Sequence, residues 1–301
     1  MAAVVPRRHR LEYEKRVNLV IDHVRDHLGE DLSLERLARV AAFSPFHFHR
    51  IFRVITGETL SASIQRHRLE RAAVALIHRR DESILTVALD HGFSSAATFA
   101  RAFKSHFGMS ATGWRAGGAG RWSKRRKANR KPSKAGKPGR RHHPLRNVTV
   151  RELPRYHVAY MRHVGPYGAH GIPDLWTRFQ KWMEARGLNG PGSIKLGIGR
   201  DDPLVTPAEK CRYDACVVVP DSFTGDQWVN VTEVPGGQHA VATFTGGPHE
   251  IQEAWDALYR SWLPGSGYQP DDRACLEVYR GNPNVSPGVF RCELCVPVRP
   301  L

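Results

Sequence analysis

A segment in the first half of the chain occurs twice, and this repeat limits the possible folds more than any other feature. The stretch "LARVAAFS" (Leu37–Ser44) aligns with "VALDHGFS" (Val87–Ser94), and "FHRIFRVITG" (Phe48–Gly57) aligns with "FARAFKSHFG" (Phe99–Gly108). Each copy predicts a short helix, a tight turn and a longer helix after a serine, which is the pattern of a helix-turn-helix motif. The repeat therefore predicts an all-α domain with two such motifs.

The longer helix of the first copy has two distinct faces. It is predicted to begin at Pro45 with Ser44 as its N-cap, because serine accepts hydrogen bonds from free N–H groups and proline has none to satisfy. Apolar residues recur at i, i+3, i+4 and i+7, which predicts a buried stripe. This stripe consists of Phe48, Ile51, Phe52 and Ile55, and the opposite face of Phe46, His49, Arg50 and Arg53.

Two histidines lie two residues apart in the same helix. Residues with this separation point in different directions on a helix, so His47 and His49 cannot chelate one metal ion. We therefore expect no metal site, and nothing in the chain indicates a cofactor. The basic face can bind a polyanion or can be only a solvated surface.

The longer helix of the second copy repeats the buried pattern with a different exposed face. It is predicted to bury Phe99, Phe103 and Phe107 and to expose small and basic residues, namely Ala97, Ala100, Arg101 and Lys104. Between the two copies, the segment Thr59–His78 contains no Gly or Pro and is long enough for a connecting helix. The first domain is thus expected to have two helix-turn-helix motifs joined by a long helix.

Basic residues are concentrated in the first half of the chain. Residues 1–147 contain 30 Lys or Arg and 12 Asp or Glu, whereas residues 148–301 contain 15 and 17. This asymmetry predicts a polyanionic partner for the first half only. Nucleic acid is the simplest candidate, and an anionic membrane surface is the alternative.

A strongly basic segment separates the two halves. Residues 121–146 contain twelve Lys or Arg and no acidic residue, among Pro, Gly and Ser, so no core can form there. We therefore expect a first domain over residues 1–116, a basic flexible linker over residues 117–147 and a second domain over residues 148–301. The linker can be a solubilising spacer or can add contacts to phosphates.

The second half contains a repeat of its own. "VRELPRYHVAYMRHVGP" (Val150–Pro166) aligns with "VTEVPGGQHAVATFTGG" (Val231–Gly247). Each copy predicts a Pro turn, an apolar strand ending in Gly, an amphipathic helix and further strands. The helices are expected at Ile172–Arg186 and His249–Leu263, and later strands at Asp214–Pro220 and Ala274–Gly281. The pattern predicts an α+β domain of two pseudo-symmetric repeats, with a cleft between them that is suited to a ligand.

All five cysteines lie in the second half. Their number is odd, and no signal peptide or long apolar span is visible, so we expect a reduced, cytoplasmic setting and no membrane partner. Cys292 and Cys295 form a C-x-x-C pair, but no second pair has zinc spacing. On the strand predicted over Val289–Val298 the two would face opposite ways, so we expect ordinary thiols.

The motif "HGFSSAATFARAFKSHFGMSATGWR" (His91–Arg115) resembles the DNA-binding domain of the AraC/XylS family of transcription regulators. The resemblance covers about Tyr13–Arg115 and includes the G-F-S, F-x-R-x-F-K and final aromatic-Arg elements. It implies double-stranded promoter DNA as a partner, read by one helix of each motif, and RNA polymerase as a further partner. The DNA-binding residues are expected to be Phe46, His49, Arg50 and Arg53 in the first copy and Ala96, Ala97, Thr98, Arg101 and Lys104 in the second.

The two predicted reading helices offer different chemistry to base edges. Arg50 can donate to O6 and N7 of guanine together, and His49 can make one hydrogen bond. Alanine and threonine methyl groups can touch a thymine methyl but make no bidentate contact. The second motif is therefore expected to discriminate less between base pairs.

The stretches "RYDACVVVP", "GGQHAVATFTG" and "CLEVYRGNP" resemble the GyrI-like effector-binding domain across Val148–Leu301. In the last of them, strand alternation places Cys275, Glu277 and Tyr279 on one face. A carboxylate on a half-buried strand is costly unless it is paired, and from spacing alone Glu277 can be edge-exposed or ligand-binding. The resemblance implies a ligand-binding glutamate in this context.

Aromatic residues can complete a site for a cation around Glu277. The candidates are Tyr279, Tyr167, Tyr213, Trp176 and Trp255. Trp176 and Trp255 also lie on apolar helical stripes, so core packing is an alternative for both.

Three functions are compatible with these features. The leading hypothesis is a cytoplasmic, nucleoid-associated transcription regulator that binds promoter DNA and senses a small, lipophilic or cationic effector. The second is a hydrolase of reactive small molecules in which Glu277 is the base or orients the nucleophile, although the sequence shows no arrangement of nucleophile, base and orienting residue. The third is an architectural DNA-binding protein.

Overall fold

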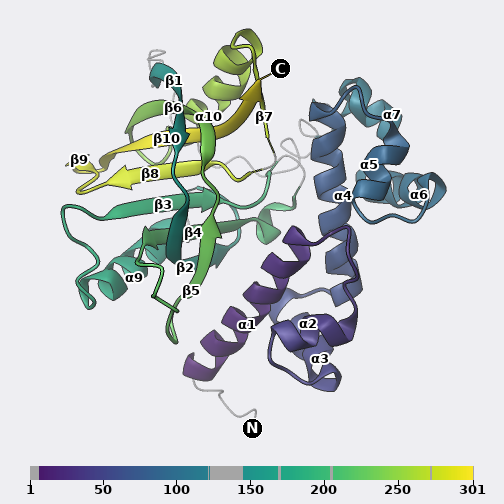
Figure 1. The fold of residues 1–301 in the computed structure, drawn as a ribbon, viewed down its shortest axis with the longest axis horizontal. Helices are drawn as coiled ribbons and strands as arrows, with labels where there is room; N and C mark the ends of the chain where they lie inside the picture. The colour runs from purple at the N-terminus through teal and green to yellow at the C-terminus, as the bar shows by residue number, and fades with distance from the viewer. Residues whose placement is uncertain are drawn as a thin grey trace. The chain divides into compact units, whose positions relative to one another are not determined.

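The computed structural model describes residues 7–120, 122, 145–168, 171–203, 206–271 and 273–300, without the side chains of residues 7–10, 46, 47, 145, 146 and 260. The chain divides into two compact units, Met1–Lys134 and Ala135–Leu301, and each is described by itself (Figure 1). Most of the predicted basic linker lies outside the described residues. Within them, no helix is long and apolar enough to cross a membrane.

The described part of the first unit is helical. α1, α2 and α3 lie around one end of α4, and α5, α6 and α7 lie around its other end (Figure 1). The helices are α1 (Arg7–Asp26), α2 (Leu34–Val40), α3 (Pro45–Thr56), α4 (Leu60–His78), α5 (Ile84–Asp90), α6 (Ala96–Phe107) and α7 (Ala111–Gly113), followed by a π-helical turn over Trp114–Gly118. α4 is the connecting helix that was predicted between the two copies of the repeat.

Helices α3 and α6 begin and end in similar ways. Each follows a serine, and each ends at a glycine in the left-handed region, Gly57 or Gly108, with φ of 71° in both. The Ser95 hydroxyl accepts a hydrogen bond from the Thr98 backbone N–H at 3.2 Å. The Ser44 hydroxyl makes no capping hydrogen bond within the described part, so only the position of that predicted cap is confirmed.

The predicted apolar stripes form the cores of the first unit. Phe48 and Phe52 are buried against α1 and α2, and Ile51 and Ile55 are half-buried beside them. In α6, Phe99, Phe103 and Phe107 are buried. The Trp114 ring packs on Phe103 and Phe107 and its indole N–H donates to the Ala73 carbonyl of α4 at 2.9 Å, which fixes the start of the π-helical turn to the long helix.

The second unit is built on a ten-stranded antiparallel sheet with the order β1-β6-β10-β8-β3-β4-β2-β5, in which β7 and β9 also pair with β10. The strands are β1 (Leu145–Leu153), β2 (Tyr156–Val164), β3 (Ile194–Gly199), β4 (Arg212–Val218), β5 (Asn230–Val234), β6 (Gly237–Gly246), β7 (Tyr268–Pro270), β8 (Leu276–Arg280), β9 (Asn284–Ser286) and β10 (Val289–Pro300). The strands predicted after each helix correspond to β4 and β8.

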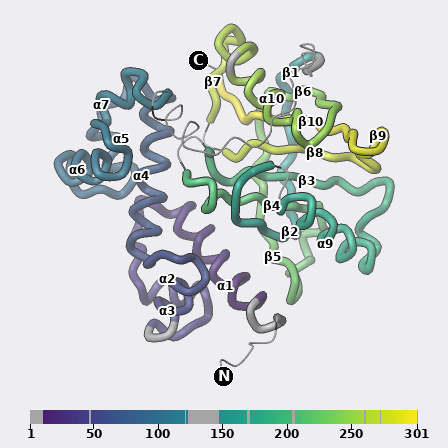
Figure 2. Tube along the Cα trace, turned by 180° about the vertical axis from the view of Figure 1, so that it is seen from behind, coloured from purple at the N-terminus to yellow at the C-terminus, as the bar shows by residue number. Residues whose placement is uncertain are grey.

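Two helices cover one face of this sheet (Figure 2). α9 (Ile172–Glu184) packs on β2 and β4, and α10 (Ile251–Ala257) packs on β6 and β10. α10 starts two residues later than predicted and continues as a π-helical turn over Leu258–Trp262 and a 3-10 turn over Leu263–Gly265. The other face of the sheet has its own apolar cluster, which includes Tyr160, Leu196 and Val278.

The cysteines are free, and four of the five are buried. Cys292 packs with the α10 cluster, whereas Cys295 packs on the other face of the sheet, as the strand alternation predicted. Among the described residues, no group of three or more His, Cys, Asp or Glu side chains could hold a metal ion.

Candidate functional site

Strand β3 presents two glycines, and therefore no side chains at these positions, to the space below the two helices; we call this part of β3 the glycine floor. Gly197 and Gly199 face the helices, because they pair with Glu277 on β8 and Tyr213 on β4. A Cβ atom at Gly197 would lie 2.1 Å from the Tyr213 hydroxyl oxygen and 2.3 Å from Glu277 Oε2. Glycine is therefore required at this position so that a phenol and a carboxylate from two different strands can meet above β3.

Glu277 is the acceptor at the centre of this floor. Its Oε2 atom accepts hydrogen bonds from the Tyr213 hydroxyl at 2.5 Å and the Tyr279 hydroxyl at 2.9 Å. The Trp255 side chain on α10 also forms a hydrogen bond with the Glu277 carboxylate. Hydrogen bonds to a charged carboxylate are roughly twice as strong as neutral ones, so the three donors stabilise the ionised form.

Burial and hydrogen bonding act on Glu277 in opposite directions. The side chain keeps some surface in contact with solvent, but protein atoms surround the carboxylate densely and desolvation raises its pKa. The hydrogen bonds from Tyr213, Tyr279 and Trp255 counteract part of this increase. Burial and the nearby Glu277 carboxylate raise the pKa of Tyr213 and of Tyr279 well above the usual value, so both phenols stay protonated and act as donors.

The structure brings the predicted ligand-binding residues together around this carboxylate. Trp176 on α9 donates from its indole N–H to the Tyr213 hydroxyl at 3.3 Å, and its ring meets Tyr279 edge-on at 5.5 Å between centroids. Trp176 and Trp255 are both half-buried, so each contributes to a core and also lies beside the charged centre. Each of the two helices thus supplies one indole.

Tyr167 lies at the edge of this group. Its ring packs edge-on against Tyr213 at 6.3 Å between centroids. Its hydroxyl is occupied elsewhere, because it donates to the Arg212 carbonyl at 2.6 Å and accepts from the Asp201 N–H at 3.1 Å. Tyr167 can therefore offer a ring face but holds the neighbouring loop with its polar end.

Two nearby residues were missed by the sequence analysis. Gly197 could have been found in "IKLGIG", because glycine inside a strand pattern signals the close approach of another group. Tyr259 gave no such signal, and its hydroxyl lies 3.0 Å from the Cys275 sulfur, on the face that carries Glu277. Burial raises the pKa of Cys275 to about 11, so this thiol stays protonated at neutral pH.

The predicted DNA-binding residues of the first unit lie at the surface where the structure describes them. On α3, the side chains of His49, Arg50 and Arg53 are exposed, opposite Phe48 and Phe52. The side chain of Phe46 lies outside the described residues, as does that of His47. On α6, the predicted residues Ala96, Ala97, Thr98, Arg101 and Lys104 are all exposed.

Comparison with protein families gives two matches along the chain. Residues 146–299 match the GyrI-like family, described as a GyrI-like small molecule binding domain. Residues 37–117 match a helix-turn-helix domain family.

Individual relatives match one half or the other. The SPbeta prophage-derived putative transcriptional regulator YosT of Bacillus subtilis is 38% identical over 112 residues, which are 37% of this chain and 74% of that protein. A DNA gyrase inhibitor of Escherichia fergusonii is 40% identical over 146 residues, which are 48% of this chain and 92% of that protein. Among solved structures, an AraC-type transcriptional regulator from Chromobacterium violaceum is 26% identical with a TM-score of 0.32, covering 34% of this chain and 89% of that one.

Proposed function

The chain belongs to the GyrI-like small-molecule-binding family and carries an AraC-type helix-turn-helix domain. We propose that it is a transcription regulator that binds promoter DNA and senses a small lipophilic cation. The observation that carries the proposal is the Glu277 carboxylate, surrounded by aromatic donors on a glycine floor. A half-buried negative charge beside aromatic rings attracts a cation both by charge and by the ring quadrupoles.

Two helix pairs support the proposal that the first unit reads DNA with two motifs. α2 and α5 have 7 residues each, and α3 and α6 have 12 residues each. Both longer helices expose the side opposite their buried phenylalanines, which a major groove can accept. Two motifs in one chain can occupy successive groove faces, so one molecule can read an asymmetric site.

The sheet order supports two repeats that meet at the proposed ligand site. The sheet order divides into two sets of four strands, β1-β6-β10-β8 and β3-β4-β2-β5. Counted inward from the two edges of the sheet, β1 corresponds to β5, β6 to β2, β10 to β4 and β8 to β3. Each set is covered by one helix. Glu277 on β8 and Gly197 on β3 lie where the two sets join, which is a common location for a ligand.

Ligand binding can be tested with a cation and an uncharged molecule of the same shape. Benzyltrimethylammonium and neopentylbenzene differ in charge, and quenching of tryptophan fluorescence reports binding next to Trp176 and Trp255. We expect the cation to bind more tightly to the full chain, and Glu277→Gln to remove most of that preference. Equal binding of both probes before and after the substitution would disprove a cation site.

DNA reading can be tested with Arg50 and a matched control. Arg50→Ala should weaken binding to the selected promoter site by about 1–3 kcal/mol and relax the preference at one base pair. Arg39→Ala removes an arginine from α2, outside the predicted reading helix. Equal losses on the selected site and on random duplexes would assign Arg50 to phosphate contact.

The hydrolase alternative is favoured by one observation, the raised pKa of Glu277, since a carboxylate with this property can act as a general base. In that case Glu277→Gln should leave the binding of a strained electrophile intact and slow the appearance of its hydrolysis product. Binding and product formation, measured on the same variant, separate the two functions.

A further inference from the structure

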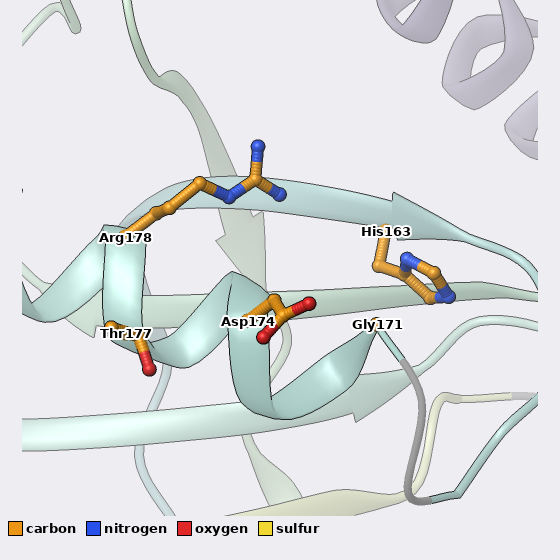
Figure 3. A pocket seen from close by; sticks show the side chains of 5 residues that line it. All are labelled: His163, Gly171, Asp174, Thr177 and Arg178. Carbon is orange, nitrogen blue, oxygen red and sulfur yellow. The ribbon is translucent and has the colours of Figure 1, made fainter.

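A cavity lies beside the start of α9, and none of the predicted ligand-binding residues lines it. Its volume is about 480 Å³. His163 at the end of β2 forms one side, and Gly171, Asp174, Thr177 and Arg178 form the other. Figure 3 shows the side chains of Asp174 and Arg178 both extending toward the end of the cavity that carries His163.

The imidazole of His163 lies against the backbone of two glycines. A Cβ atom at Gly165 would lie 2.8 Å from Nε2, and one at Gly171 would lie 2.2 Å from Cε1, so neither position tolerates a side chain without displacing the ring. Gly171 also has φ of 87°, in the region that favours glycine. The ring is therefore enclosed on two sides.

His163 is also kept in its neutral form. Burial lowers its pKa, and the positive charge of Arg178 lowers it further. Its Nε2 atom is buried and has no hydrogen-bond partner among the described residues. Because Nε2 is buried, Nδ1 is the ring nitrogen left for a ligand, and a neutral ring can bind a polar group there without adding charge to the cavity.

Asp174 and Arg178 supply one charge of each sign. They are one turn apart on α9, a spacing at which a carboxylate and a guanidinium commonly pair. Within the described part of the chain, neither forms an ion pair or a hydrogen bond through its side chain. Both are exposed, so both are available to a ligand from solution.

We infer that this cavity binds a small zwitterion of the α-amino acid class. Arg178 would bind the carboxylate in a bidentate manner, and Asp174 would accept hydrogen bonds from the ammonium group. An anion alone meets the repulsion of Asp174, and a cation alone meets that of Arg178. Only a ligand with both charges satisfies both side chains.

The remaining lining is suited to the same ligand. Thr177 also lines the cavity, and because its hydroxyl donates to the Pro173 carbonyl at 2.9 Å, its oxygen has only acceptor capacity left. The neutral His163 ring adds one polar contact. The cavity volume is within the range of about 300–1,000 Å³ that is usual for small-molecule sites.

The cavity is separate from the Glu277 site but adjacent to it. His163 on β2 pairs with Tyr213 on β4, the residue that donates to Glu277. α9 carries Trp176 on the side of that site and Asp174 and Arg178 on the cavity side. A ligand here would hold the first two turns of α9 without touching Glu277.

The test uses the full chain and the twenty common L-amino acids, each titrated by isothermal calorimetry. At least one should bind saturably, with a dissociation constant of about 0.1–10 mM, because the two charged side chains are solvent-exposed. For the amino acid that binds most tightly, the analogue without its ammonium group and the analogue without its carboxylate should each bind at least about tenfold more weakly.

Two variants and one control locate the site. Arg178→Gln and Asp174→Asn should each weaken amino-acid binding about tenfold. The helical circular dichroism of both variants should be unchanged, which separates a binding effect from unfolding. Lys181→Gln removes an exposed charge from the same helix outside the lining and should change nothing. The inference is overturned if no amino acid binds at about 20 mM, if an analogue with one charge binds as tightly, or if Arg178→Gln has no effect.

Discussion

The two helices that flank Glu277 are built differently. α9 is a regular helix of 13 residues with four buried side chains, Leu175, Phe179, Trp182 and Met183. α10 has 7 regular residues, of which only Ala254 is buried, and then changes to a π-helical turn that buries Leu258. The proposed ligand site thus has one regular wall, formed by α9, and one irregular wall, formed by α10 and its π-helical turn. Such π-helical turns are frequent at functional sites.

Further contacts fix the regular wall. The rings of Phe179 and Trp182 stack with centroids 5.4 Å apart, and Arg186 lies over the Trp182 ring at 4.6 Å. The Trp182 indole N–H donates to Asp226 at 2.9 Å, and Asp226 also accepts from the backbone N–H groups of Trp228 and Val229. From this difference we expect α9 to position a ligand and α10 to adapt to its shape.

The largest expected effect compares one buried side chain in each wall. Phe179→Ala should destabilise the second unit by about 3–5 kcal/mol, because it leaves a cavity under a rigid helix. Leu258→Ala should cost about 2–3 kcal/mol, since the irregular backbone can collapse into the space. Urea unfolding of both variants measures the two values. A larger loss for Leu258→Ala would show that α10 is the more rigid wall.

The next effect concerns the anchor of the regular wall. Asp226→Ala should reduce the free energy of unfolding by about 1–3 kcal/mol, because it removes a charged acceptor from an indole, a guanidinium and two backbone N–H groups. The emission of Trp182 should shift as its N–H loses this partner. Asp221→Ala, at a more exposed carboxylate of the same loop, is the control and should have little effect.

A smaller effect tests the two indoles. Trp255→Phe removes a hydrogen bond to the Glu277 carboxylate, whereas Trp176→Phe removes one to the Tyr213 hydroxyl. A donor to the charged form lowers a pKa, so Trp255→Phe should raise the pKa of Glu277 more than Trp176→Phe does. Carbon-13 NMR titration of the glutamate carboxyl checks this order. The reverse order would mean that α9, not α10, stabilises the charge.

The smallest effect is a pair of opposite pH dependences. His157 on β2 contacts the Phe223 carbonyl at 2.9 Å and the Glu233 carboxylate at 2.7 Å. These two acceptors and the negative charge of Asp221 raise the pKa of His157. The pKa is raised even though Arg155 also forms an ion pair with Glu233. His239 on β6 is buried beside Arg273, and desolvation is the main cause of its lowered pKa.

The sign of each contribution follows from these directions. The stabilisation by His157 is complete below the unfolded pKa of about 6.5 and is lost as the pH rises through the higher folded pKa. For His239 the unfolded chain binds the proton more readily, so stability falls as the pH drops below about 6.5. NMR titration should find His157 above and His239 below this value. Titration of both on the same side would remove this difference between the two halves of the sheet.

Local patterns predicted much of this fold. The i, i+3, i+4 spacing identified the buried sides of α3 and α6, and alternation placed Cys292 and Cys295 on opposite faces. Alternation also placed Glu277 beside Tyr279. These features depend on residues near each other in the chain.

The remaining features depend on sheet order, which local patterns do not encode. Tyr213 reaches Glu277 only because β3 lies between β4 and β8 and has glycine at residue 197. The cavity at His163 likewise requires the end of β2 to meet the start of α9. The π-helical turn after α10 was missed because its sequence continues the apolar spacing of a regular helix, and tertiary packing determines the change.

The position of β1 at one edge of the sheet has a consequence for synthesis of the chain. β1 ends at Leu153 and pairs with β6, which begins at Gly237, so its partner leaves the ribosome only after α9 and the strands β2 to β5 have been made. Those four strands can already pair as β3-β4-β2-β5, while β1 waits with its backbone groups exposed. A nascent chain at this stage has an open strand that a neighbouring chain on the same messenger could capture through its own β6. Slow translation between these residues would therefore favour strand-exchanged dimers over a sheet that pairs β1 with β6 of the same chain.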